Sequence, residues 1–229
     1  MKKTLLILCC LYVVFTLQAV YLGLSNFYFS HITGENGLSQ SNVKAIIQDS
    51  YGFMWFGTKN GLNRFDGTSI VQMNCDDYVV GTGNHNISAL FEDKERQLWV
   101  GTDRGVYRYN PALDIFTAMN METEEGVNMN NWVSNIVADS IGNIWIVIPD
   151  QGVFRYKDEK LYFYEVTNKE HFKTEAPDCI LVRPDGDVWV GTWGVGLFRY
   201  DRNTDKFEQY CVDKTGRSLK GKNINFICN

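Results

Sequence analysis

The sequence predicts an all-β fold: a β-propeller of four-stranded antiparallel blades, with about four blades and one further strand present. A tryptophan recurs at Trp55, Trp99, Trp145 and Trp189, at spacings of 44, 46 and 44 residues. Each lies in an apolar run that is followed by a glycine-containing turn and an apolar–x–Arg–aromatic segment. A repeat near 44 residues with four short strands is typical of propeller blades, and these strands alternate rather than follow a helical period.

The first strand of each repeat lies upstream of its tryptophan. The segments NVKAIIQDS, NISALFEDK and WVSNIVADS align, while the fourth copy, PDCILVRPDG, is degenerate and starts near Pro177. Asp49, Asp93 and Asp139 each stand six residues before their tryptophan. Their position between the first and second strands indicates that these aspartates form turns, and recurrence in successive blades favours a scaffold role.

The second and third strands surround a tight turn in FMWFGTKNGLNRFDG, QLWVGTDRGVYRYN, NIWIVIPDQGVFRYKD and DVWVGTWGVGLFRYD. The second strand is apolar on both faces, so a sheet must pack on each side of it. The third repeat departs from the others, because IVIPDQGVF lacks the Gly-Thr step. Each repeat ends in an apolar or aromatic strand: SIVQM, IFTAM, LYFYEV or KFEQYCV.

These patterns place blades at about 42–76, 86–121, 132–167 and 176–212, within a propeller domain of residues 20–229. A fifth repeat begins with NINFI at residue 223. The segment NFYFSHIT, Asn26–Thr33, resembles the last strand of a blade whose other strands are not present. We therefore expect a fragment of a longer propeller or a truncated gene product.

The first 19 residues read as a secretory signal peptide, with MKK before the apolar run Thr4–Leu17. An uncleaved anchor is the alternative, although 14 apolar residues are short for a membrane span. Export permits one or two disulfides among Cys75, Cys179, Cys211 and Cys228. Buried unpaired thiols are the other interpretation, and no C-x-x-C occurs.

Composition excludes several function classes. Hydrophobic residues make up 45% and aromatic residues 14% of the 229 residues, which is ample for a packed core. The net charge of −5 argues against a nucleic-acid partner, because nucleic-acid binding needs a basic face. The three histidines show no metal-binding spacing. We predict no catalytic residue, no metal site and no cofactor.

Two tryptophans outside the repeat pattern are candidate ligand-binding residues. Trp132 stands just before the first strand of the third blade, and Trp193 stands in the turn after the second strand of the fourth. Those connections emerge on the same face of a propeller, and aromatic rings suit the C–H faces of sugars. Packing between blades is the alternative for Trp193. Asn60, Arg104 and Gln151 are polar candidates in equivalent turns.

The stretch GLSQSNVKAIIQDSYGFMWFGTKNGLNRFDG, Gly37–Gly67, resembles the two-component regulator propeller repeat, and GTWGVGLFRYD resembles a later copy. The resemblance covers about Phe27–Asn229. It implies the N-terminal periplasmic sensor region of a hybrid histidine kinase, typically from Bacteroidetes, anchored in the inner membrane. Such proteins usually carry further propeller blades, a kinase, a receiver and a DNA-binding domain, and sense products of polysaccharide breakdown.

The resemblance therefore implies an oligosaccharide ligand, partners in the remainder of the propeller and the kinase, and a possible homodimer. Any kinase activity would belong to the parent protein, because none of the kinase motifs lies in this chain. The alternatives are a free-standing secreted propeller that binds protein or carbohydrate, and a propeller lyase or hydrolase. The enzyme would need unrepeated His, Glu or Arg residues converging on the channel, and the sequence offers no such set.

Overall fold

The computed structural model describes residues 29–73, 86–119, 121–166, 176–210 and 223–228. Contacts divide the chain into two units, Met1–Ile32 and Thr33–Asn229, and every described strand lies in the second unit. Within the described ranges, no helix combines the length and apolar character needed to cross a membrane. The predicted signal segment 1–19 lies outside the described residues.

The described strands form four antiparallel sheets, here called blades 1 to 4, and consecutive strands are neighbours in each. Blade 1 contains β1 (Val43–Gln48), β2 (Met54–Thr58), β3 (Gly61–Phe65) and β4 (Ile70–Met73), preceded by the short 3-10 helix η1 (Gly34–Asn36). Blade 2 contains β5 (Ile87–Glu92), β6 (Leu98–Thr102), β7 (Gly105–Asn110) and β8 (Ile115–Ala118). Blade 3 contains β9 (Asn135–Ala138), β10 (Ile144–Ile148), β11 (Gly152–Lys157) and β12 (Lys160–Tyr164). Blade 4 contains β13 (Ala176–Val182), β14 (Val188–Trp193), β15 (Leu197–Asp201) and β16 (Lys206–Gln209).

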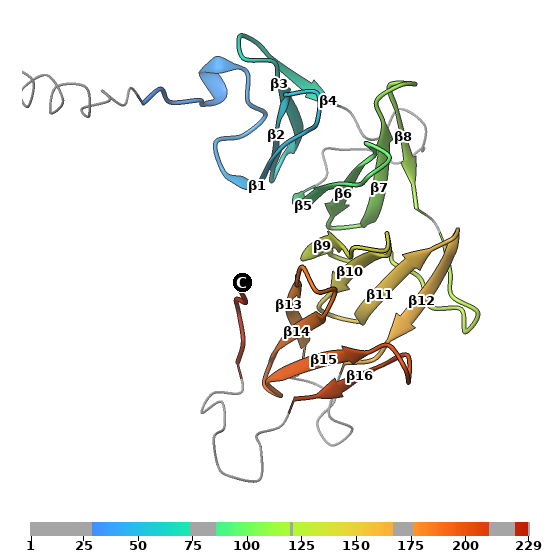
Figure 1. Cartoon of the computed structure of the whole chain (residues 1–229). Coiled ribbons are helices and arrows are strands. Elements are labelled where there is room, and N and C mark those ends of the chain that lie inside the picture. The colour runs from blue at the N-terminus through green and yellow to red at the C-terminus, as the bar shows by residue number, and fades with distance from the viewer. Residues whose placement is uncertain (1–28, 74–85, 120, 167–175, 211–222, 229) are drawn as a thin grey trace, which may run out of the picture. The chain divides into compact units, whose positions relative to one another are not determined.

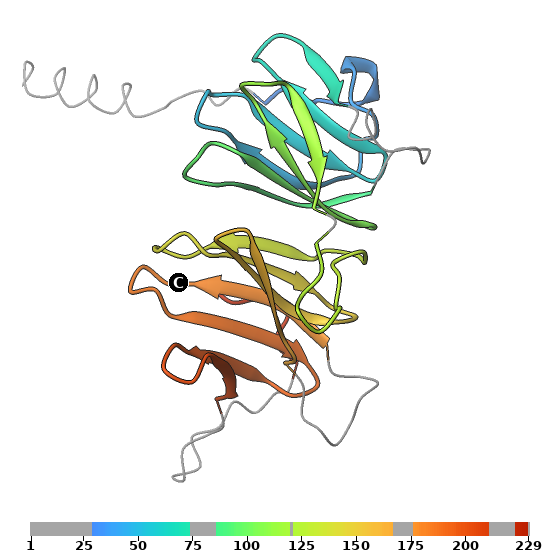
Figure 2. The same cartoon turned by 90° about the vertical axis from the view of Figure 1, so that its right-hand side faces the viewer.

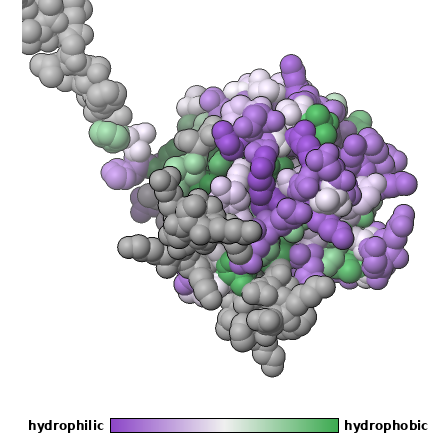
Figure 3. Space-filling view, turned by 60° about the horizontal axis from the view of Figure 1, so that its bottom comes forward, coloured by the Kyte–Doolittle hydropathy of each residue, from purple (hydrophilic) through white to green (hydrophobic). Residues whose placement is uncertain are grey.

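The blades stack in chain order. Strand β1 contacts β5, β5 contacts β9, and β9 contacts β13 (Figure 1). The same succession of sheets is visible from the side in Figure 2. The described strands do not close into a ring, so the predicted fold class, an incomplete all-β propeller, is confirmed. Figure 3 views the unit from the side of blade 4, where hydrophilic residues predominate and hydrophobic residues form separate patches.

The core lies between the sheets and is centred on the repeat tryptophans. Trp55, Trp99 and Trp145 are almost completely buried. Each packs against a third-strand tyrosine of the next blade, with Trp55 and Tyr109 ring centroids 5.3 Å apart. The pairs Trp99–Tyr156 and Trp145–Tyr200 repeat this contact at 5.2 and 4.8 Å. Edge-to-face and tilted aromatic pairs of this kind stabilise a core beyond the area that they bury.

The recurrent aspartates do more than form turns. The Asp49 carboxylate accepts hydrogen bonds from the N–H groups of Tyr51 and Phe53, which closes the turn between β1 and β2. Its other oxygen accepts from the Trp55 indole at 2.7 Å. Asp93 and Asp139 accept from Trp99 and Trp145 in the same way. The sequence predicted the turn, whereas the bond to the indole is a finding of the structure.

Blade 4 lacks this acceptor, because Arg183 stands where the other blades have aspartate. The Trp189 indole N–H is buried and has no partner among the described residues. Trp189 is only partly buried, and Tyr210 packs on its ring at 5.1 Å in place of a tyrosine from a further blade. The four repeat tryptophans recur as core positions by sequence, but Trp189 is the one of them that is not fully buried.

A side chain from later in the sequence fills a gap left by glycine in β2, β6 and β14. A Cβ added to Gly57 would lie 2.6 Å from Ile87 Cγ2, and one added to Gly101 would lie 2.7 Å from Val133 Cγ1. At Gly191 the corresponding neighbour is Ile224 Cγ2, at 2.5 Å. We call Ile87, Val133 and Ile224 the knob residues. The glycine of the Gly-Thr step is thus required by close packing between blades.

The junction between blades 3 and 4 lacks this glycine-and-knob contact. Val147 and Ile148 stand where the other blades have Gly-Thr, and Pro177 stands at the knob position of blade 4. The Val133 and Ile224 N–H groups donate to the carbonyls of Thr102 and Thr192. Proline has no N–H to donate, so this junction cannot form the same hydrogen bond. The loss of the Gly-Thr step in the third repeat is therefore accompanied by a proline at the knob position of the fourth.

The expected strands at residues 26–33 and from residue 223 fall partly on residues that the structure describes. Residues 29–33 of the segment Asn26–Thr33 form no strand, and Phe29 is 89% exposed. Each described sheet pairs its own four strands, so this segment has no strand partner among the described residues, in keeping with a strand whose blade is not present. Residues 223–228 also form no strand, although Ile224 occupies the knob position. Cys179 is buried and Cys228 exposed, both unpaired, and Cys75 and Cys211 lie outside the described residues.

Candidate functional site

The candidate site is the end of the sheets where first strands begin and second strands end. The pairing register shows this end directly, because Val43 lies opposite Thr58 and Ile87 opposite Thr102. In blade 4, Ala176 lies opposite Trp193. The connection into each blade and the turn between its second and third strands therefore emerge together, as predicted. We call this the turn-end face, comprising residues 39–42, 59–60, 86, 103–104, 130–132, 149–151, 193–196 and 223.

Buried threonines fix the turns of this face. The Thr58 hydroxyl donates to the Gly61 carbonyl and accepts from the Asn60 N–H. Thr102 holds the turn that contains Arg104 with the same two bonds. Thr192 donates to the Gly196 carbonyl at 2.8 Å. These bonds fix the backbone of the turns at Asn60 and Arg104, while both side chains are exposed.

The structure brings Trp132 next to the turn that carries Arg104. Val133 donates its N–H to the Thr102 carbonyl, and the backbone of residues 129–130 lies against Gly105. Trp132 belongs to the entry into blade 3, and residues on both sides of it contact the turn of blade 2. Its side chain is 40% exposed, a large fraction for an indole.

Trp193 occupies a different position from the predicted one. It is the last residue of β14, paired with Ala176, and the turn follows at residues 194–196. The extra length arises because Gly194 and Gly196 both adopt positive φ, which moves the turn beyond the tryptophan. Trp193 is 50% exposed in this structure. Asn60, Gln151 and Trp193 lie on three different blades at this same end.

Sequence reasoning missed the segment that enters blade 1. The Ser39 N–H donates to Asn63 Oδ1, and the Ser39 and Thr58 hydroxyls are 2.8 Å apart. These bonds anchor the neighbouring residue Gln40 at the turn-end face. The motif Gly37-Leu38-Ser39 was the available signal, because it opens the stretch that resembles the repeat family.

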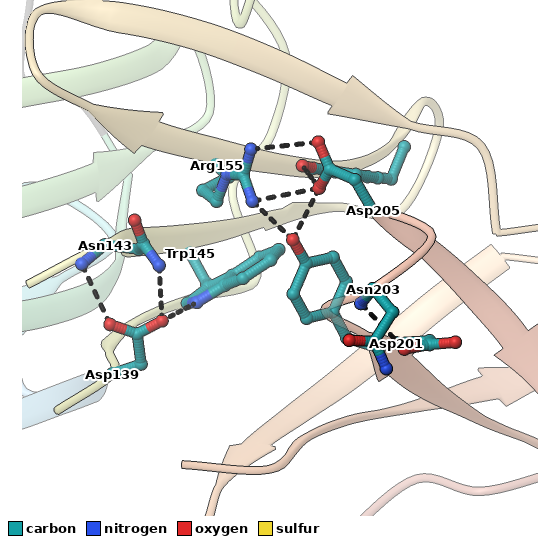
Figure 4. A network of polar contacts seen from close by, with 9 residues as sticks. Asp139, Asn143, Trp145, Arg155, Asp201, Asn203 and Asp205 are labelled. Atoms are coloured by element: carbon teal, nitrogen blue, oxygen red, sulfur yellow. Dashed lines mark hydrogen bonds and ion pairs between the residues drawn. The ribbon is translucent and has the colours of Figure 1, made fainter. Parts of the chain in front are cut away.

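A second polar cluster joins blades 3 and 4 (Figure 4). Arg155 Nη1 forms an ion pair with Asp205 at 3.0 Å, and Arg155 also donates to the Tyr200 hydroxyl. The hydroxyls of Tyr164 and Tyr200 both donate to Asp205 Oδ1. Burial alone would raise the pKa of Asp205, but the two tyrosine hydrogen bonds and the charge of Arg155 hold it below its usual value. Since every member contacts another member, the cluster acts as a structural link.

Tyrosines of these inter-blade contacts should make the protein sensitive to alkali. Burial and the nearby Asp114 carboxylate raise the pKa of Tyr109 to about 12, and burial raises the pKa values of Tyr164 and Tyr200 in the same direction. In the unfolded chain these phenols lose their protons near pH 10. The unfolded state then binds fewer protons than the folded state, so stability falls as the pH rises from about 10 towards 12.

Thermal unfolding followed by circular dichroism at pH 8, 10, 11 and 12 measures this loss. Tyr109→Phe is the control, because it removes one of the shifted phenols; its melting temperature should decline less steeply above pH 10. Parallel declines in the two proteins would contradict the assignment to Tyr109.

A cavity of about 520 Å3 lies beside this cluster. It is lined by Met121, Glu122, Glu124, Glu125, Glu159, Lys160, Leu161, Tyr162, Phe163, Tyr164, Glu165, Asp205, Lys206 and Phe207. The pair Glu124–Glu125, an acidic loop pair in the sequence, is exposed here. None of the five predicted ligand-binding residues lines the cavity. In the part of the chain that the structure describes, no group of three His, Cys, Asp or Glu residues is placed to hold a metal ion.

Comparison with known families gives two matches in the sequence. Residues 37–60 and 81–104 match the family described as two component regulator propeller. Histidine kinase P4 from Formosa agariphila is 49% identical over 55 residues, which cover 23% of this chain and 4% of that kinase. Two segments of the chain therefore match this repeat family, and the chain spans a small part of this relative's length.

Solved structures agree with the fold. The extracellular domain of a putative hybrid two component system from B. thetaiotaomicron matches 74% of this chain and 25% of its own, with 25% identity and a TM-score of 0.60. A virginiamycin B lyase from Staphylococcus aureus, solved with quinupristin, matches 77% of this chain and 57% of its own. Its TM-score is 0.58 at 14% identity, a likeness that shows the propeller fold alone.

Proposed function

We propose that this chain, which carries repeats of the two-component regulator propeller family, is part of the exported ligand-sensing region of a histidine kinase. The observation that carries the proposal is the agreement of two independent comparisons. The repeat match at residues 37–60 and 81–104 and the likeness to an extracellular hybrid two-component domain point to the same class of protein. Both relatives extend well beyond the matched region, so the output step belongs to segments outside this chain.

The ligand in this proposal is a glycan or oligosaccharide bound at the turn-end face. Its support is the pair of exposed indoles, Trp132 and Trp193, because a sugar ring can pack its C–H face on an aromatic ring. The fixed turns beneath Asn60 and Arg104 provide polar groups on a rigid base.

Signalling would follow from differential binding. A ligand that binds one arrangement of the sensor more tightly than another shifts the population toward it. In a homodimer anchored in the inner membrane, such a shift would change the relative positions of the two kinase domains and so the expression of polysaccharide-utilisation genes. This mechanism needs no chemistry in the propeller, in keeping with the scaffold roles found for its recurrent aspartates and tryptophans.

The test has two parts. The messenger RNA that encodes this chain should also encode a histidine kinase in the same reading frame, and the full chain should bind oligosaccharides in isothermal titration calorimetry. A reading frame without kinase sequence would overturn the sensor assignment. A folded chain that binds no member of a panel of neutral and acidic hexasaccharides would overturn the choice of ligand.

A further inference from the structure

The outer edge of blade 3 lies in a groove. Strand β12 is the last strand of its sheet, so one of its edges has no neighbouring strand (Figure 1). The cavity of about 520 Å3 described above follows this strand, because the consecutive residues 159–165 all line it. Residues 121–125 and 205–207 supply the rest of its lining. We call this cavity the rim groove.

The two flanking segments lie on opposite faces of β12. Leu161 and Phe163 pack in the core between blades 2 and 3, together with Met121. Tyr164 packs in the core between blades 3 and 4, together with Phe207. Successive side chains of a strand point to opposite faces of its sheet, so the flanking segments form two walls. The edge of β12 is therefore the floor between them.

The turn into β12 determines which backbone groups face the groove. Residues 158–159 both adopt positive φ, as in a two-residue type I′ hairpin. The flanking pair Lys157 and Lys160 then exchanges both backbone hydrogen bonds, and every second pair after it does the same. Leu161 and Phe163 consequently direct their N–H and C=O groups away from β11. No described backbone group outside the sheet bonds to them.

Strand β12 lacks the features that usually protect an open edge. Its five residues pair with β11 in one continuous register, without a bulge. The stretch LYFY after Lys160 contains neither proline nor a charged residue. An edge of this composition is a template for pairing with another extended segment.

The rim groove is acidic. Five exposed glutamates line it, and none of them forms an ion pair within the described ranges: Glu122, Glu124, Glu125, Glu159 and Glu165. Asp205 is paired with Arg155, and the basic residues of the lining are Lys160 and Lys206. The segment 167–175, which follows blade 3 and lies outside the described residues, carries two lysines and two glutamates and leaves this balance unchanged.

We propose that the rim groove docks an extended basic segment of a partner protein, which adds to β12 as a fifth strand. Its backbone pairs with the N–H and C=O groups of Leu161 and Phe163. Its lysine or arginine side chains, at every second position, face the glutamates of residues 121–125, and the apolar residues between them pack on Tyr162 and Phe207. The net charge of −5 disfavours a second copy of this chain as the occupant.

This interaction is separate from the ligand proposed above, because no residue of the turn-end face lines the rim groove. Failure of one proposal therefore leaves the other standing.

The probe is a fluorescein-labelled octapeptide of alternating lysine and valine, titrated with the full chain and followed by fluorescence anisotropy. A peptide of alternating glutamate and valine should bind at least about tenfold more weakly, because its charge is reversed. N-methylation of the four central amides of the lysine–valine peptide should cost a similar factor, because it removes the backbone donors. Equal binding of the methylated peptide would overturn strand addition, and no binding of the lysine–valine peptide would overturn the whole proposal.

The double variant Glu124→Lys with Glu125→Lys tests the acidic wall. It should weaken binding of the lysine–valine peptide about tenfold at physiological salt and leave the melting temperature nearly unchanged, since both side chains are exposed. The control is Glu35→Lys with Glu95→Lys, which makes the same change of charge at exposed positions outside the groove. Equal weakening in the two double variants would reduce the interaction to general charge attraction and overturn the site.

Two further measurements identify other occupants of the groove. Sedimentation velocity that shows a dimer, dissociated by the peptide, would assign the groove to a second copy of the chain. Residues 211–222 contain four basic residues, Lys214, Arg217, Lys220 and Lys222. Peptide binding that appears only when these four are replaced by serine would assign the groove to the chain's own segment. Either result would overturn docking of a partner protein.

Discussion

Trp145→Ala lowers the free energy of unfolding by about 4 kcal/mol, the usual size for loss of a fully buried tryptophan. The Trp145 side chain is inaccessible to solvent and packs against Tyr164, Tyr200 and Phe207. Its indole N–H donates to Asp139, and the Arg155 guanidinium lies 5.7 Å from its ring. The substitution leaves a cavity between blades 3 and 4, while Asp139 loses one hydrogen bond and keeps those from Ile141 and Asn143. Urea unfolding followed by circular dichroism measures the change.

Trp132→Ala and Trp193→Ala are the matched controls, because they make the same chemical change at exposed positions. Each should alter the free energy of unfolding by less than about 0.5 kcal/mol. A large loss of stability in either variant would show that its indole belongs to the packing between blades. Near-equal losses in all three variants would contradict the division between core and surface tryptophans.

Gly101→Ala lowers the free energy of unfolding by about 3 kcal/mol, at the upper end of the range for overpacking. The added Cβ would lie 2.7 Å from Val133 Cγ1 and 3.0 Å from Ala89 Cβ, distances that require the backbone or the knob residue to move. Blade 3 shows that the position accepts a larger residue only when the knob changes too, because Val147 is accompanied by Pro177.

The double variant Gly101→Ala with Val133→Ala isolates the contact. Shortening the knob makes room for the new methyl group, so the double variant should be more stable than the sum of the single changes predicts. Gly34→Ala is the control, because nothing lies within 4 Å of its added Cβ and its φ is not positive. Strict additivity of the two changes would show that the cost of Gly101→Ala arises elsewhere.

Much of the fold follows from periodic features of the sequence. The spacing of the repeat tryptophans and the apolar second strands predicted four-stranded blades, and both features act within one repeat. The knob contacts were not predictable in this way, because Gly101 and Val133 belong to different blades and touch only after the sheets stack. The bond from Asp49 to the Trp55 indole was likewise hidden, since a turn alone explained the aspartate.

The candidate site was predicted in location more than in detail. The repeat pattern placed Trp132 at the correct end of its blade, and the register confirms that the connections and turns emerge together. Trp193 was predicted to lie in the turn, whereas it is the last residue of β14. A Gly-rich turn can begin at several residues with similar backbone energy, so the sequence does not fix where the strand ends. The buried, unpartnered side-chain oxygens of Gln40 and Asn86 could not be predicted, because burial of a single amide oxygen depends on neighbouring blades.

Because of the knob residues, a complete packing unit of this protein does not end at the last strand of a sheet. Blade 2 is filled by Val133, and blade 4 by Ile224, although each residue comes after the last strand of the blade that it completes. A duplication, deletion or engineered truncation that cuts between sheets would separate each glycine from its filler. The boundary between packing units lies just after the knob residue that follows each blade. A shortened chain that ends there should keep its last blade packed.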